Sequence, residues 1–197
     1  MIKFNVADLN ALIKSRRSVF PKSYSGERVP EHIIQHMLEN ATWAPTHKRT
    51  EPWRFQVFTG AGLLRLGALQ ADCYHKVTKG DGTFDQSRHD NLLKKPAEAS
   101  HVILVAMQRD REQRVPAWEE IGAVFCAIQN MYLTATAFGV GCYLSTGGIT
   151  QFPEANSFFG LSADDKICGF LHVGMPKEES PAGKRKPVSE VTKWITE

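Results

Sequence analysis

Near the start of the chain, two arginines and a serine stand in a row as Arg16, Arg17 and Ser18. A phosphate group needs positive charge together with directed hydrogen-bond donors. Two guanidinium groups supply several N–H donors in fixed planes, and a serine adds a hydroxyl. The triplet therefore suits a phosphate or another anion. It also fits a solvated helix end whose arginines interact with the helix dipole, so the remaining motifs have to decide between these two interpretations.

A second candidate segment, ATWAPTHKRTEPWRF, covers residues 41–55. A helix is expected to end here, a proline-bounded loop follows, and a strand then begins. Such a loop can present Trp43 or His47 to a flat ligand. The alternative is an ordinary turn with Trp53 packed beneath it, and Trp53 itself is expected in the core.

The third segment, GVGCYLSTGG at residues 139–148, follows a long apolar helix expected at 117–138, whose apolar face is expected in the core. Its glycines permit close backbone approach, while Ser145 and Thr146 offer hydroxyls, which suits hydrogen bonding to a heteroaromatic ring or a phosphate. It is not a dinucleotide fingerprint, because its G-x-G follows a helix rather than a strand and lacks a third glycine at the required spacing.

The last candidate is the cationic cluster GKRKP at residues 183–187. Lys184 and Arg185 either form a solvated charge run or make a second contact to the same anion. His32 and His36 are spaced i, i+4 and could share a metal ion, but no third ligand is evident, so no metal site is expected. The sequence contains neither a G-x-S-x-G element nor a P-loop, and no side chain is predicted to be a catalytic nucleophile or base.

The bulk composition is that of one globular domain spanning residues 1–197, with an extended tail at 177–197. The net charge of +3 does not suggest a nucleic-acid-binding protein, which would show a strong basic stripe. No secretory signal is visible, and no apolar run approaches the roughly 20 residues of a membrane span. The four cysteines are scattered; Cys126 and Cys168 lie in apolar runs and are expected to be buried free thiols, which fits a reducing cytoplasm.

The hydrophobic pattern predicts a mixed chain. Helices are expected at 8–17, from Pro30 to just before Pro45, at 61–77 and at 117–138; strands at 52–60, 101–108 and 166–176, with a short one inside 139–148; and a loop at 79–91. Because the helices are uneven and no regular βαβ rhythm appears, we predict an α+β fold with helices around a small sheet.

Taken in order, the motifs RRS, WAPTHKRTEPWRF, VPAWEE…GVGCYLSTGG and GFLHVGMP…GKRKPVSEV resemble the nitroreductase family of flavoproteins. The APTHK loop and the short length are similar to its compact subgroup of NAD(P)H nitroreductases. The resemblance implies a nitroreductase-like α+β fold with a small, mostly antiparallel central sheet. It also implies an interlocked homodimer that binds FMN at the subunit interface.

The resemblance further implies a role for each matching residue. The phosphate and ribityl chain would be held by Arg16, Arg17 and Ser18, with Lys184 or Arg185 adding to the phosphate site. The flavin would be contacted from the same subunit by Leu144, Ser145 and Thr146. Trp43 and His47 would reach in from the partner, and residues 134–139 would face the nicotinamide.

The implied activity is hydride transfer from NADH or NADPH through flavin N5 to a nitroaromatic, quinone or similar small-molecule acceptor, by a ping-pong mechanism. The chain departs from many relatives at Arg49 and Glu51, where they carry Asn and Gln, and at Val19 and Phe20, where they carry a lysine beside the flavin. These differences affect redox potential and substrate choice more than flavin binding. A flavin-binding carrier or sensor with little turnover stays open, as does non-nitro flavin chemistry such as dehalogenation or enoyl-type reduction.

Overall fold

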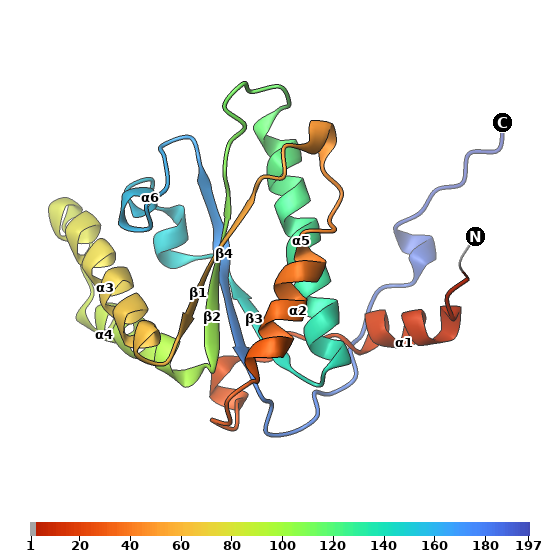
Figure 1. Ribbon diagram of the computed structural model, residues 1–197, viewed down its shortest axis with the longest axis horizontal. Helices are drawn as coiled ribbons and strands as arrows, with labels where there is room; N and C mark the ends of the chain where they lie inside the picture. Colours follow the sequence, from red (N-terminus) through yellow and green to blue (C-terminus); the bar gives the residue numbers. More distant parts are fainter. Residues whose placement is uncertain (1–2) are drawn as a thin grey trace.

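The computed structural model describes residues 3–197 and contains one four-stranded sheet. Its strands are β1 (Trp53–Thr59), β2 (His101–Met107), β3 (Gly141–Ser145) and β4 (Lys166–Gly174), arranged in the order β1-β2-β4-β3. Every neighbouring pair is antiparallel. The prediction of a small antiparallel sheet is therefore confirmed. All seven residues of the central strand β2 are buried, because helices cover both faces of the sheet (Figure 1).

Within residues 3–197 there are six α-helices: α1 (Val6–Ser15), α2 (Glu31–Ala41), α3 (Ala61–Asp81), α4 (Gln86–Lys94), α5 (Ala117–Ala137) and the short α6 (Ala155–Phe158). On β2, Ile103 and Val105 point toward α2 and α5, whereas Val102 and Leu104 point toward α3. This alternation is the period of two expected of a strand buried on both faces. The two hydrophobic clusters thus lie on opposite faces of the sheet (Figure 1).

The first helix stands apart from this core. No residue of α1 is buried, and its apolar residues Leu9 and Ile13 are 49% and 48% exposed. Figure 1 shows α1 and the C-terminal tail extending from the same side of the body. The apolar side chains of α1 are therefore left largely uncovered by the rest of the chain.

Two expectations from the sequence were wrong. Residues 79–91 were expected to form a loop, yet α4 begins at Gln86. The turn is confined to a few residues: Gly82 ends α3 with a φ of 75°, and the Asp85 carboxylate caps α4 by accepting from the Arg88 N–H at 2.6 Å. Cys126 was expected to be buried but is exposed, because it lies on the solvent side of α5 while Val124 and Ala127 face the core.

Candidate functional site

The Arg16 side chain lies at the end of α1 with its donors unused. Arg16 is the residue at which the backbone leaves the helix. Its guanidinium carbon lies 5.1 Å from the centroid of the Tyr132 ring on α5. Among residues 3–197 the guanidinium N–H groups have no hydrogen-bond or ion-pair partner. A half-buried arginine held on an aromatic face with free donors is well suited to bind an anion.

The neighbouring Arg17 has a different environment. Its Nη1 donates to the carbonyl oxygens of Lys14, at 2.6 Å, and of Arg16, at 2.8 Å. Its Nε donates to the carbonyl of Pro181 in the tail, at 3.0 Å. These bonds satisfy carbonyls at the end of α1 and attach residues 181–183 to the body. Only the Nη2 group of Arg17 is left for a ligand.

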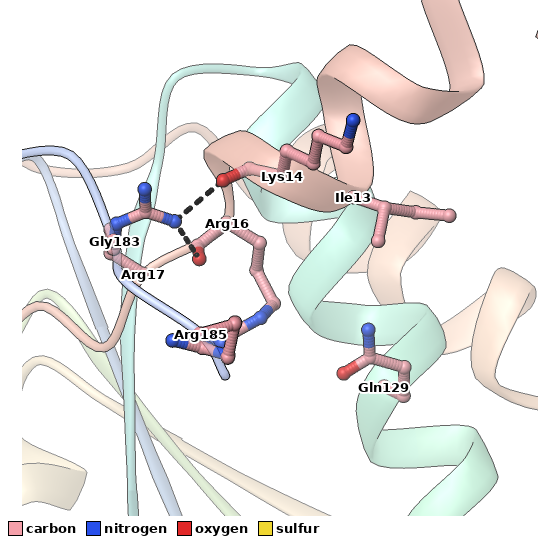
Figure 2. Close-up of a pocket in the computed structure, with 7 residues that line it drawn as sticks. All are labelled: Ile13, Lys14, Arg16, Arg17, Gln129, Gly183 and Arg185. Carbon is pink, nitrogen blue, oxygen red and sulfur yellow. Dashed lines mark hydrogen bonds between the residues drawn. The ribbon is translucent and has the colours of Figure 1, made fainter. Parts of the chain in front are cut away.

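The tail completes a cavity of about 510 Å³ over the end of α1. Its lining residues are Ile13, Lys14, Arg16, Arg17, Gln129, Gly183 and Arg185. Figure 2 shows the Arg16 side chain extending toward the tail segment that carries Gly183 and Arg185. A Cβ atom at Gly183 would lie 2.7 Å from Cζ of Arg17, so a larger residue here would displace the Arg17 guanidinium. Of the two tail cations considered from the sequence, Arg185 lines this cavity and Lys184 does not.

Ser18 and Leu144 are brought together by the edge strand β3. Ser18 forms a parallel bridge with Cys142, and the Tyr132 hydroxyl accepts the Leu144 N–H at 2.8 Å. Burial raises the pKa of Tyr132, and a hydrogen bond with Ser18 and the charge of Arg16 act in the opposite direction. A Cβ at Gly169 would lie 2.9 Å from the Ser145 carbonyl oxygen, so glycine lets β4 approach this part of β3 closely.

The residues after Leu144 lead away from the cavity. Ser145 ends β3, and Thr146 is exposed in the following loop. The Thr146 carbonyl accepts from the Thr150 hydroxyl at 2.6 Å and from the Gln151 amide at 2.7 Å. These hydrogen bonds use the backbone carbonyl of Thr146 and leave its side-chain hydroxyl available to a ligand at the end of β3.

Trp43 lies on the other side of α1. It is 83% exposed and lines a groove of about 400 Å³ together with Leu12 of α1 and Thr134 and Phe138 of the α5 end. Since Leu12 faces this groove and Ile13 faces the arginine cavity, α1 separates the two. Part of the predicted nicotinamide segment 134–139 therefore lies beside Trp43 rather than beside Arg16.

His47 lies at the opposite end of α5, in a loop with unusual backbone geometry. Its Nδ1 lies 2.6 Å from the Glu119 carboxylate in the first turn of α5. Lys48, Arg49 and Glu51 all have positive φ, at 50°, 52° and 44°. Such conformations cost free energy in residues other than glycine and tend to occur at functional sites.

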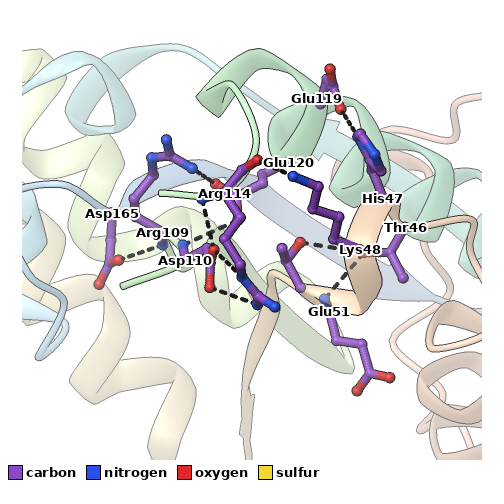
Figure 3. A network of polar contacts seen from close by, with 11 residues as sticks. Thr46, His47, Lys48, Glu51, Arg109, Asp110, Arg114, Glu119, Glu120 and Asp165 are labelled. Carbon is purple, nitrogen blue, oxygen red and sulfur yellow. Dashed lines mark hydrogen bonds and ion pairs between the residues drawn. The ribbon is translucent and has the colours of Figure 1, made fainter. Parts of the chain in front are cut away.

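A polar network lies beside this loop and contacts it through Lys48 (Figure 3). The Lys48 ammonium donates to the Arg114 carbonyl at 3.0 Å. Arg114 donates two side-chain hydrogen bonds and one backbone hydrogen bond to the Asp110 carboxylate, and these bonds lower the pKa of that carboxyl to about 2. Glu120, which is 1% exposed, pairs with Arg109 and also accepts the Asp110 N–H at 3.1 Å. The loop with positive φ values thus contacts the first turn of α5 through His47 and the segment before α5 through Lys48.

The predicted site residues fall into separate groups within one chain. Glu119, beside His47, and Tyr132, beside Arg16, are 13 positions apart on α5, which corresponds to about 20 Å at 1.5 Å per residue. The structure brings Arg16, Arg17, Ser18, Leu144 and Arg185 into one region, whereas Trp43 and His47 lie elsewhere on the same chain.

The structure adds residues that the sequence reasoning missed. Tyr132, Gln129 and Glu119 are all on α5, which was interpreted mainly as a core helix. A phenol inside an apolar helix needs a hydrogen-bond partner when buried, and this was the available signal for Tyr132. Within residues 3–197 no group of three or more potential metal ligands occurs, and no helix is long and apolar enough to cross a membrane.

Comparison with known proteins identifies the fold and the family. The sequence model of the Nitroreductase family matches residues 13–175. The chain belongs to the nitroreductase family. YfhC of Bacillus subtilis, provisionally named an NAD(P)H nitroreductase, is 31% identical over 183 residues, which cover 92% of this chain and 91% of that protein. Iodotyrosine deiodinase of Hydra vulgaris is 27% identical, over 93% of this chain and 71% of that protein.

Solved structures agree with this assignment. A nitroreductase-like family protein from Bacillus cereus superposes with a TM-score of 0.79 at 27% identity and covers 100% of both chains. A nitroreductase-type protein from Desulfovibrio desulfuricans, solved in complex with FMN, superposes with a TM-score of 0.69 at 23% identity over 98% of both chains. The predicted nitroreductase-like fold is confirmed.

Proposed function

We propose that this nitroreductase-family protein is an FMN-dependent oxidoreductase that transfers hydride from NADH or NADPH to a nitroaromatic, quinone or similar conjugated acceptor. The observation that carries the proposal is the cavity at the end of α1, where Arg16, Arg17 and Arg185 converge in a nitroreductase fold.

The donors around this cavity fit a phosphate monoester. Arg16 offers all of its N–H groups, Arg17 offers its Nη2, and Arg185 and Lys14 add positive charge. Charge-assisted hydrogen bonds of this kind are about twice as strong as neutral ones. The FMN complex of the D. desulfuricans protein, which shares the fold, supports the same assignment.

The flavin ring would lie toward β3, where Leu144, Ser145 and Thr146 offer backbone and hydroxyl groups. When bound, FMN would supply the hydride transfer through its N5. The chain's own residues would bind and orient the cofactor and its substrates, so no catalytic side chain is required. Since one pocket would serve the electron donor and the acceptor in turn, the reaction is expected to follow ping-pong kinetics.

We also propose that the protein works as a homodimer with FMN at the interface, where Trp43 and His47 would reach the cofactor of the partner subunit. Two features support this. First, His47 lies about 20 Å along α5 from Arg16. Second, large apolar side chains are exposed on α1 and in the tail, including Val6 at 67% and Trp194 at 85%, and such surfaces mark interaction sites. A cytoplasmic location is proposed because all four cysteines are free.

The purified protein provides the test. It should show flavin absorbance and release FMN on denaturation, and it should oxidise NADH or NADPH when menadione or a nitrofuran is added. Steady-state plots at several NAD(P)H concentrations should give parallel lines, and intersecting lines would contradict the ping-pong scheme. A flavin-loaded protein that does not oxidise NAD(P)H with any of these acceptors would instead be a carrier or sensor.

Reductive dehalogenation is a second candidate, favoured by the similarity to the deiodinase of Hydra vulgaris. It is distinguished by supplying 3-iodotyrosine under anaerobic conditions with a chemical reductant. Release of iodide at a rate above that of free FMN would favour this activity over nitro or quinone reduction.

A further inference from the structure

Tyr132 connects two parts of the proposed site that come from distant segments of the chain. It is 7% exposed on the C-terminal half of α5. The guanidinium carbon of Arg16 lies 5.1 Å from its ring centroid, and its hydroxyl accepts the Leu144 N–H at 2.8 Å. Arg16 belongs to the end of α1, and Leu144 belongs to β3. One side chain therefore touches both the anion-binding end and the ring-facing end of the site.

The contact with Arg16 matters because the Tyr132 ring restricts a side chain that is otherwise held by no polar partner within residues 3–197. Among residues 3–197 the Arg16 guanidinium has no hydrogen-bond or ion-pair partner. A long side chain without such contacts loses rotamer freedom when it binds a ligand, which weakens binding. A guanidinium resting on an aromatic face is already restricted, while its N–H groups stay free at the edge of the ring.

The hydroxyl of Tyr132 has a second effect. Leu144 lies in the edge strand β3, whose neighbour β4 bonds it on one side only. By accepting the Leu144 N–H, the hydroxyl satisfies a backbone group that would otherwise need another partner.

We propose that Tyr132 is a positioning residue that orients Arg16 through its ring and the Leu144 backbone through its hydroxyl. The inference rests on the proposed function, because Arg16 and Leu144 are taken to contact the phosphate and ring ends of FMN. The ring and the hydroxyl act on different ends of the ligand, so their contributions can be separated.

Tyr132→Leu tests the ring. Dissociation constants for FMN and for riboflavin, which has the same ring system without the phosphate, are measured by quenching of flavin fluorescence on the full-length apoprotein. Without the Tyr132 ring beneath it, the Arg16 side chain should have to be ordered when FMN binds. This should lower the preference for FMN over riboflavin by about 2- to 12-fold, the cost of ordering one long side chain on binding. A general loosening of the site would change the dissociation constants for FMN and riboflavin by the same factor, so it would leave the ratio of the two constants unchanged.

Tyr132→Phe tests the hydroxyl and remains informative if the leucine variant does not fold. It keeps the ring, so the preference for FMN over riboflavin should equal that of the wild type. The Leu144 N–H loses its acceptor, so both affinities should fall together by about 2- to 12-fold, the range for one net hydrogen bond, and the visible spectrum of bound flavin should shift.

Tyr74 offers a matched control on the other face of the sheet. It is 2% exposed, its hydroxyl accepts the Asp85 N–H at 3.1 Å, and the Arg88 guanidinium carbon lies 5.4 Å from its ring centroid. Tyr74→Leu and Tyr74→Phe therefore remove the same kinds of contact away from the proposed site. They should lower the melting temperature without changing the preference for FMN.

The outcomes separate this inference from the proposed function. If the wild-type protein binds no FMN, the proposed function is wrong and this inference with it. If the wild type binds FMN but Tyr132→Leu keeps the wild-type preference, or Tyr74→Leu alters the preference equally, the ring has no positioning role. A Tyr132→Phe protein with wild-type affinities and flavin spectrum would overturn the role of the hydroxyl.

Discussion

The two adjacent arginines should behave differently when each is replaced by alanine, although the sequence presents them as a pair. Across residues 3–197 no group accepts a hydrogen bond from the Arg16 guanidinium, which lies over the Tyr132 ring. Arg16→Ala should therefore weaken FMN binding by about 1.5–3 kcal/mol, or roughly 10- to 150-fold, the value of a charged hydrogen-bonding partner. The free energy of unfolding of the apoprotein should fall by no more than about 1 kcal/mol, the value of a cation–π contact near the surface.

Arg17 should show the reverse pattern. Its Nη1 and Nε donate to three carbonyl groups, at Lys14, Arg16 and Pro181, which leaves only Nη2 for a ligand. Arg17→Ala should weaken FMN binding by less than 10-fold, because roughly 1.4 kcal/mol corresponds to a factor of ten and most of its donors are already used. Loss of the bond to Pro181 should release the tail.

The assay combines FMN titration, thermal melting of the apoprotein and limited proteolysis of the tail after residue 180. Arg65→Ala serves as the control, since Arg65 is an exposed arginine on α3 that lines a different cavity. We expect faster tail cleavage in Arg17→Ala and not in Arg16→Ala. If Arg17→Ala costs more FMN affinity than Arg16→Ala while tail cleavage stays at the wild-type rate, the assignment of the two arginines is wrong.

Three further predictions concern the supporting structure. Glu119→Gln should lower FMN affinity by less than 5-fold, since the partly exposed pair with His47 is worth about 0.2–1 kcal/mol. The effect of Glu119→Gln should disappear when His47 is also replaced by alanine. An effect that persists in the double variant would mean that Glu119 acts independently of His47. Burial lowers the pKa of His172 from 6.5 to about 4, and its Nδ1 has no partner among residues 3–197. Between these two pH values the unfolded chain binds a proton that the folded protein does not. The contribution of His172 to the free energy of unfolding should therefore be constant above pH 6.5 and fall by about 3 kcal/mol on acidification to pH 4. Urea titrations should show that the free energy of unfolding of His172→Asn depends less on pH, and an unchanged dependence would refute this. Finally, Glu120→Leu should destabilise the protein by about 3 kcal/mol, because it leaves Arg109 unpaired at a largely buried site, and the Arg109→Met/Glu120→Leu double variant should recover most of the melting temperature; a double variant no better than the single one would contradict this reasoning.

Much of the architecture could be predicted because it depends on local patterns. The apolar run at 101–108 and the long apolar segment at 117–138 correspond closely to β2 and α5. The errors also have local causes. The capping role of Asp85 was not recognised within a polar stretch, and the exposed position of Cys126 depends on which side of α5 faces the sheet.

The site could be predicted only as a set of candidates. The sequence offered the cluster at 183–187 as a second contact to the same anion, and only the path of the tail shows that Arg185, and not Lys184, lines the cavity beside Arg16 and Arg17. Trp43 and His47 share one loop region in the sequence, yet Trp43 lies in a groove beside the end of α5 and His47 pairs with its first turn.

The sequence alone thus determined the α+β class, the order of the motifs and the presence of an anion-suited triplet, because periodicity and residue type act over a few neighbouring positions. The tertiary structure decided which residues lie together. The Arg17 bond to Pro181 joins residues 164 positions apart, and the contact of Arg16 with Tyr132 joins helices that the sequence places far from one another. Such contacts depend on how the packed elements bring distant segments together, which no local pattern specifies.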